Sequence, residues 1–149
     1  MSTIFSVATA ALVAVLKQSP PVAPVVDRVL LRAVGKNDRF AVVVRPFGGN
    51  RDSSVGAGVV GVWTTGYEIE CSAWVMPDVA PDLAVDPLLE AVYARLMANP
   101  TLGGAVADLQ PAPDNTLRYG FDQVGENTVT ATLSFHVRHA SGAHTLASP

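Results

Sequence analysis

The residues whose types and spacing could support chemistry begin with a glycine motif at positions 56–61, which reads GAGVVG. A dinucleotide-binding G-x-G-x-x-G needs a hydrophobic strand before it and a helix after it, so that the phosphates meet the helix N-terminus. Here the polar run 50–54 precedes the glycines and the β-like residues 62–65 follow them. The motif therefore favours a bulge or close packing in a strand over nucleotide binding.

Two further patterns could bind a cation. His136 and His139 lie in a strand-like segment, where positions three apart point to opposite faces and cannot converge on one ion. Asp78, Asp82 and Asp86 are spaced by four in a proline-broken stretch, which allows a loose cation site but favours a solvated loop and a helix cap. The sequence therefore indicates no metal and no cofactor.

The evidence for an enzyme is weak. The single cysteine, Cys71, excludes an internal disulfide, fits a reducing compartment and is interpreted as a small buried hydrophobe. Acid–base pairs, nucleophile–His arrangements and phosphate loops with supporting context are otherwise missing from the sequence. One alternative stays open, namely a small-ligand binding module or enzyme in which Trp63, Trp74 and nearby acids line a pocket.

The stretch most suited to binding is a polar, glycine-containing loop predicted at 46–54 and long enough to project from the body. Its candidate assembly contacts are Arg45, Phe47, Asn50 and Arg51, because an aromatic ring and arginines on a projecting loop suit a contact arm. An ordinary solvent loop is the competing interpretation. We expect Arg51→Glu or Phe47→Ala to impair assembly and leave the fold intact.

Composition favours burial against partner subunits. Apolar residues make up 49% of the 149 positions and charged residues only 15%, which leaves few charges for a monomer's surface. The net charge of −3 gives no general attraction to nucleic acid. Residues 1–51 hold seven Lys or Arg against two acids, whereas the remainder holds three Arg against eleven acids. This polarity suits head-to-tail contact between identical subunits, unless folding mixes the charges on one surface.

The first apolar stretch, 5–16, resembles a signal-peptide core. It lacks a basic leader, has a poor cleavage context at 17–21 and is too short to span a bilayer, so no membrane association is expected. We predict instead a helix capped by Ser2 or Thr3 that ends before Pro20. Its apolar stripe would comprise Ile4, Val7, Ala11, Leu12, Val15 and Leu16.

Strand signals follow. Runs at 27–34 and 39–45 predict a hairpin across 35–38, and a Val/Gly run at 55–63 leads to a turn at 64–66. Strict alternation then predicts a strand at 67–76. Later segments predict a strand near 105–110 and a pairing of 117–123 with 127–139 across a turn at 125–127. The expected buried face of the last strand comprises Val129, Ala131, Leu133, Phe135 and Val137.

The second helix has the clearest boundaries. We predict that Asp86 is its N-cap, Pro87 its first residue and Asn99-Pro100 its end, followed by a Leu-Gly-Gly turn at 102–104. Its buried stripe would comprise Leu89, Val92, Tyr93 and Leu96. The sum is an α+β domain over 1–140, with two principal helices on one face of a mainly antiparallel sheet and a flexible tail at 141–149.

The order of features from residue 67 onward resembles the tail-terminator proteins of long-tailed bacteriophages, also called tail completion or head–tail joining proteins. An acidic alternating strand (YEIECSAWV) precedes an Asp-led helix and Leu-Gly-Gly turn (DPLLEAVYARLMANPTLGG), and the last strand is Thr-rich (TVTATLSFHVRH). The Pro-rich linker 20–24 and the Gly-rich segment 48–61 depart from the family pattern. Another neck or minor tail protein of similar build is the alternative.

The resemblance implies a non-enzymatic virion subunit, assembled in the host cytoplasm, that forms a hexameric ring on the head-proximal end of the tail tube. The ring would stop tube polymerisation and bind the head–tail connector, and DNA could pass through it without being recognised by sequence. No catalytic residue, cofactor or metal is implied. The matching motif implies structural roles for Asp86, Leu89, Val92, Leu96, Leu102 and Gly103.

Overall fold

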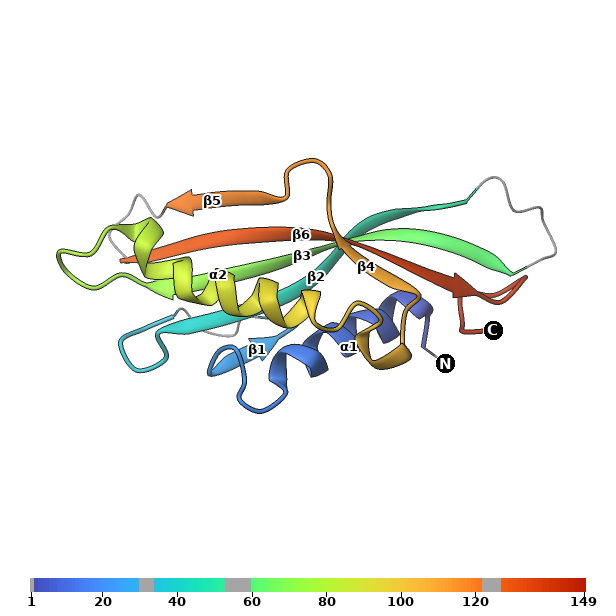
Figure 1. The fold of residues 1–149 in the computed structure, drawn as a ribbon, viewed down its shortest axis with the longest axis horizontal. Coiled ribbons are helices and arrows are strands. Elements are labelled where there is room, and N and C mark those ends of the chain that lie inside the picture. The colour runs from blue at the N-terminus through green and yellow to red at the C-terminus, as the bar shows by residue number, and fades with distance from the viewer. Residues whose placement is uncertain (1, 30–33, 53–59, 122–126) are drawn as a thin grey trace.

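The computed structural model describes residues 2–29, 34–52, 60–121 and 127–149. Two helices pack against a six-stranded, mostly antiparallel sheet, which confirms the α+β class (Figure 1). In chain order the elements are α1 (Ile4–Lys17), β1 (Val25–Asp27), β2 (Phe40–Arg51), β3 (Gly61–Trp74), α2 (Pro81–Met97), the 3₁₀ turn η1 (Leu102–Gly104), β4 (Asp108–Pro111), β5 (Leu117–Phe121) and β6 (Thr128–Ser141).

The sheet order is β1-β2-β3-β6-β4, and β5 also pairs with β6. The two short strands share the outer edge of β6, with β4 opposite residues 135–138 and β5 opposite residues 129–133. The predicted pairing of 117–123 with 127–139 is confirmed for the described residues, whereas the turn at 125–127 lies largely outside them. The strand expected at 105–110 begins later, at Asp108.

The predicted hairpin of 27–34 with 39–45 is wrong. β1 is parallel to β2, with Val25 opposite Ala41 and Asp27 opposite Val43. Parallel neighbours cannot be joined by a tight turn, because the chain must return along the sheet before it pairs. Positions 30–33 of the predicted first strand lie outside the described residues.

The predicted loop at 46–54 and the turn at 64–66 are also wrong, since β2 continues to Arg51 and pairs with β3 throughout. The ladder shifts register between Pro46 and Gly48, which accommodates a proline inside the strand. β2 and β3 run on past both helices in Figure 1. Residues 53–59 lie outside the described part, and Gly61 opens a strand where a dinucleotide fingerprint would require a helix.

The core lies between the helices and one face of the three long strands. Alternate residues 67–73 of β3 and 129–137 of β6 are buried, as their period of two predicts. Val42 and Val44 of β2 continue this face through their pairing with Cys71 and Ile69. The three strands therefore present one continuous apolar surface, which α1 and α2 cover.

α1 begins and ends as predicted. The Thr3 hydroxyl accepts a hydrogen bond from the Ser6 amide at 3.3 Å, and the helix ends at Lys17, before Pro20. The buried stripe is rotated from the predicted one, because Ala8 is fully buried and Val7 is exposed. The remaining buried members are Ile4, Thr9, Leu12, Val15 and Leu16.

α2 begins six residues earlier than predicted, at Pro81 instead of Pro87. Its N-cap is Ala80 and Pro81 lies in the first turn, so Asp86 is not the cap and Pro87 lies inside the helix. A proline at position 81 or at position 87 could open a helix, so the sequence allows either start. The helix begins at the earlier proline, which brings Val85 into the core. The predicted end is confirmed, since the helix stops at Met97 and the Asn99 side chain donates to the Arg95 carbonyl at 2.8 Å.

The Leu-Gly-Gly turn is confirmed as η1, in which Gly103 and Gly104 have φ angles of 71° and 92° that favour glycine. Leu102 is buried there against α1. At the C-terminus, where a flexible tail was expected from 141, Ser141 is the last residue of β6. The Leu146 carbonyl accepts a hydrogen bond from the Ile4 amide at 2.7 Å.

Candidate assembly surfaces

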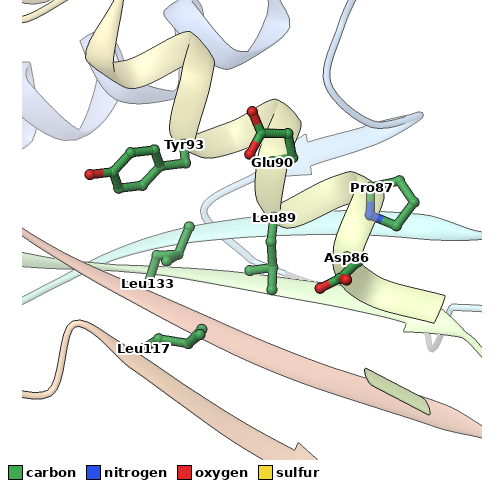
Figure 2. A pocket seen from close by; sticks show the side chains of 7 residues that line it. All are labelled: Asp86, Pro87, Leu89, Glu90, Tyr93, Leu117 and Leu133. Carbon is green, nitrogen blue, oxygen red and sulfur yellow. The ribbon is translucent and has the colours of Figure 1, made fainter. Parts of the chain in front are cut away.

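A groove of about 500 Å³ opens between α2 and the edge strand β5 (Figure 2). Leu89 projects into it from the helix, and Leu117 and Leu133 approach from β5 and β6. The Tyr93 ring lies over the buried ring of Phe135, with centroids 6.1 Å apart. We call this surface, together with the side chains of β5 on the same face, the β5 groove.

β5 carries the exposed apolar side chains of this surface. Leu117, Tyr119 and Phe121 pair with Leu133, Ala131 and Val129, so they belong to the face of the sheet that the helices cover. α2 lies over β3 and β6 and leaves β5 uncovered, and all five residues of β5 are exposed. The rings of Tyr119 and Phe121 stack in parallel at 6.0 Å.

The exposed side of α2 borders the β5 groove with acids. Asp82, Asp86 and Glu90 are spaced by four, so they follow one another along the helix surface. The structure therefore places two of the three acids of the predicted cation pattern inside α2, and only Asp78 in the preceding loop. Asp82 in the first turn also interacts favourably with the helix dipole.

The predicted contact residues lie on the β2–β3 ribbon instead of a loop. Phe47 is 56% exposed, and a Cβ at Gly66 would overlap its ring, so the ring lies directly on that glycine. Arg45 forms an ion pair with Glu70 at 3.1 Å across the two strands. Asn50 is exposed, whereas Arg51 is partly buried at the end of β2. An assembly role for these four residues stays a prediction.

The face of the sheet opposite the helices is polar. Arg45 and Glu70 form one ion pair on it, and Arg118 and Glu68 form a second one. A hollow of about 370 Å³ lies beside Glu68, Arg118 and His136, with the β4–β5 connection as its wall. The carboxylate of Glu68 and the guanidinium of Arg118 are paired with one another at the edge of this hollow, and Asp114 and His136 also line it.

His139 and Thr65 form a buried polar contact on the helix-covered face, with 2.8 Å between Nε2 and the hydroxyl. The ring of Phe5 packs edge-on against His139 and Trp63. Burial lowers the pKa of His139, because the charged imidazolium is poorly solvated there. Its Nδ1 has no hydrogen-bond partner within the part of the chain that the structure describes. His136 points to the opposite face, as its spacing predicts.

The alternative pocket lined by Trp63 and Trp74 is wrong. The two residues are eleven positions apart on β3, so they lie on opposite faces and near opposite ends of that strand. Cys71 is buried as predicted, and burial raises the pKa of its thiol to about 12, which makes it a poor nucleophile. The two tryptophans therefore do not line one pocket.

The described residues form neither a cluster of metal ligands nor a membrane-spanning helix. Across ranges 2–29, 34–52, 60–121 and 127–149, no three His, Cys, Asp or Glu side chains gather where they could hold a metal ion. Neither described helix is long and apolar enough to cross a membrane.

The structure separates the residues of the family-like motif. Leu89, Val92 and Leu96 pack in the core and Leu102 joins them from η1, whereas Asp86 borders the β5 groove. Gly103 is exposed and shapes the turn. Sequence reasoning missed the apolar residues of β5, although the alternation of Leu117, Tyr119 and Phe121 was a strand signal with a large apolar face.

Comparison with known proteins finds no family model that matches this chain and no similar curated protein.

Proposed function

We propose that this protein is a structural virion subunit that forms a ring on the head-proximal end of a phage tail tube. The ring ends tube polymerisation and joins the tail to the head. Its partners are further copies of the same chain, six in a closed ring, together with the tube protein and the head–tail connector. It acts without a catalytic centre, is assembled in the host cytoplasm and lets DNA pass without reading its sequence.

The observation that carries the proposal is the uncovered apolar surface of the β5 groove. Monomeric soluble proteins rarely expose a contiguous apolar patch of this kind, and such patches mark sites of association. Here Leu117, Tyr119 and Phe121 are 42–55% exposed on the outermost strand. An edge strand with free backbone groups and large apolar side chains tends to pair with another chain.

Two further features support a phage tail protein over other assembly proteins. The order of strand, helix, Leu-Gly-Gly turn and final Thr-rich strand is that of the terminator-like motif, and the turn takes the expected form, although the helix begins at Pro81 and is not led by Asp86. β2 and β3 also extend past the helices (Figure 1), and Phe47 and Arg45 are exposed on β2, which suits contact with a second protein. Another neck protein of similar build would differ only in its position in the virion.

Tube growth tests the proposal directly. Tube protein encoded beside the gene for this chain is polymerised with and without an excess of the purified chain, and tube lengths are measured by electron microscopy. We expect shorter tubes with extra density at one end, and sedimentation of the chain with the tubes. Unchanged tube lengths and a chain that stays in the supernatant would overturn the proposal.

Native mass across a concentration series, with and without divalent cation, tests the ring itself. A discrete closed oligomer of six subunits is expected, either in free solution or when tubes are present as a template. Phe47→Ala and Arg51→Glu should reduce binding to tubes without a change in thermal unfolding. A collapse of the thermal transition in these variants would instead assign both residues to the stability of the ribbon.

A further inference from the structure

We propose that the β5 groove receives the basic β1 edge of a second copy of this chain, in a head-to-tail contact. The inference deepens the proposed ring, because it names the two surfaces that neighbouring subunits bring together. The β1 edge is defined by the exposed basic side chains Lys17, Arg28, Lys36 and Arg39, which flank β1 and the start of β2.

A monomer leaves the apolar side chains of β5 uncovered. Tyr119 and Phe121 are 42% and 55% exposed, although they share a sheet face with fully buried residues of β6. Across the described residues β5 pairs with β6 alone, so the backbone groups of its outer edge are free to bind another strand or loop. On the helix side, Leu83 is 60% exposed and extends the apolar surface along α2.

Charge identifies the occupant. The exposed acids Asp86 and Glu90 line the β5 groove, Asp82 precedes them by one turn of α2, and Asp78 lies just before the helix. The nearest basic groups are engaged elsewhere. Arg118 forms an ion pair with Glu68 on the opposite sheet face, and Arg95 donates to one carbonyl in the last turn of α1 and to two carbonyls of the α1–β1 connection. The groove is therefore apolar at its base and negative at its rim, so it favours a basic partner surface.

The β1 edge has the complementary charge on the other side of the sheet. Lys17, Lys36 and Arg39 are exposed, and Arg28 extends over α1 to donate to the Ser6 carbonyl at 3.0 Å. The acids in this region are Asp27, which accepts from the Arg28 amide, and Asp38, which is only partly exposed. The charge polarity predicted from the sequence is thus kept in the fold as a difference between two sheet edges.

The positions of the two surfaces determine the symmetry of the contact. β1 and β5 lie at opposite edges of one sheet (Figure 1), so a groove-to-edge contact leaves an unused groove and an unused edge on each pair. Such heterologous contacts add further copies, and they form a closed ring where the rotation between neighbouring subunits closes on itself. A two-fold contact of groove with groove would bring acids against acids, which is unfavourable. Complementarity therefore favours a cyclic assembly over an isologous dimer.

Charge reversal tests this contact because a head-to-tail interface can be rescued by mixing. One variant carries Asp86→Lys and Glu90→Lys, and the other carries Lys36→Glu and Arg39→Glu. Each variant should need at least about tenfold more protein to form the wild-type oligomer, as measured by native mass and sedimentation. Asp114→Lys, in the β4–β5 connection, is the matched control and should assemble as wild type.

An equimolar mixture of the two variants should recover the oligomer at the wild-type concentration. In an alternating ring every reversed groove meets a reversed edge, and every native groove meets a native edge. Failure of the mixture to recover, assembly of both variants as wild type, or a wild-type chain that stays monomeric alone and on tubes would each overturn the inference. An isologous contact between two grooves would leave the Lys36→Glu and Arg39→Glu variant assembling as wild type.

The outcomes separate this inference from the proposed function. Recovery of a mixed oligomer that neither shortens tubes nor binds them would support the contact and overturn the phage function. Wild-type and charge-reversed chains that all cap tubes through the same oligomer would keep the function and overturn the contact. Tyr119→Asp tests the apolar part independently, and it should abolish the oligomer while Leu146→Ser, equally exposed near the C-terminus, leaves it unchanged.

Discussion

The two flanks of α2 differ in what covers them, although both carry large apolar residues. On one flank Val92 and Leu96 are fully buried among side chains of α1 and the sheet. On the other flank Leu83 and Tyr93 are exposed, and the β5 groove separates the helix from the edge strand. The same helix therefore holds the fold together on one side and presents a surface for association on the other.

This difference shows that an apolar stripe does not by itself mark a core. The buried flank lies over the three long strands, whose alternate residues are already apolar. The open flank faces β5, a five-residue strand that reaches the sheet only through β6. Which flank is buried thus depends on the width of the sheet under the helix, and the helix sequence alone does not state it.

The largest expected contrast lies between one leucine from each region. Leu96→Ala should lower the free energy of unfolding by about 2–5 kcal/mol, because it opens a cavity in a fully packed site. Leu117→Ala, on exposed β5, should change it by less than about 1 kcal/mol when the chain is kept monomeric by dilution. Urea unfolding followed by fluorescence measures both values, and equal losses would contradict a real difference between the flanks.

Arg95 tests the packed side through its polar contacts. Its guanidinium donates to the Val15 carbonyl at 2.9 Å, the Gln18 carbonyl at 3.0 Å and the Pro20 carbonyl at 2.6 Å, and so ties α2 to the end of α1. Arg95→Ala should cost about 1.5–3 kcal/mol of unfolding free energy.

Arg95→Lys is the control, because lysine keeps the charge but cannot match the planar fork of donors. It should recover only part of the loss. Full recovery by lysine would show that charge, rather than the set of three hydrogen bonds, accounts for the effect.

A smaller effect is expected from pH at the helix-covered face. Burial lowers the pKa of His139 in the folded chain below the ordinary imidazole value of about 6.5, so the unfolded chain binds the proton more readily. Neutral His139 thus contributes stability that is present above about pH 6.5 and is lost as pH falls through that value. His139→Gln should flatten this part of the stability profile, as measured by urea unfolding at a series of pH values.

The smallest effect is expected on the face that no helix covers. Arg45 and Glu70 are ion-paired there with side chains 53% and 30% exposed, so solvent screens their attraction. A double-mutant cycle with Arg45→Ala and Glu70→Ala should give a coupling of about 0–1 kcal/mol, smaller still in high salt. A coupling well above that range would mean that the ribbon depends on this pair for its structure.

The sequence predicted the parts of the fold that depend on local rules. The α+β class, the Thr3 cap, the end of α2 before Pro100 and the buried faces of β3 and β6 follow from capping and periodicity, and all are confirmed. The Leu-Gly-Gly turn at 102–104 was also predicted, and its glycines adopt the positive φ angles that such a turn requires. These signals lie within a few residues of the feature they specify.

The errors arose where contacts between residues far apart in the sequence determine the secondary structure or the strand pairing. Gly48, Gly49 and Asn50 are typical of loops, but pairing with β3 keeps them in a strand. The hairpin predicted between 27–34 and 39–45 is wrong because the sequence does not show that Val25–Asp27 pairs in parallel with β2. The β5 groove was not predicted at all, since Leu117 and Leu89 are 28 positions apart and only the fold brings them to one surface.

The hydrogen bond between the Ile4 amide and the Leu146 carbonyl has a practical consequence for labelling the protein. It brings the two ends of the described chain to one corner, away from β5 (Figure 1). A tag or fluorophore on either end would therefore report the same point on the subunit. In an assembled ring such labels would form a single circle, whose radius and distance from the tube end would give the orientation of every subunit.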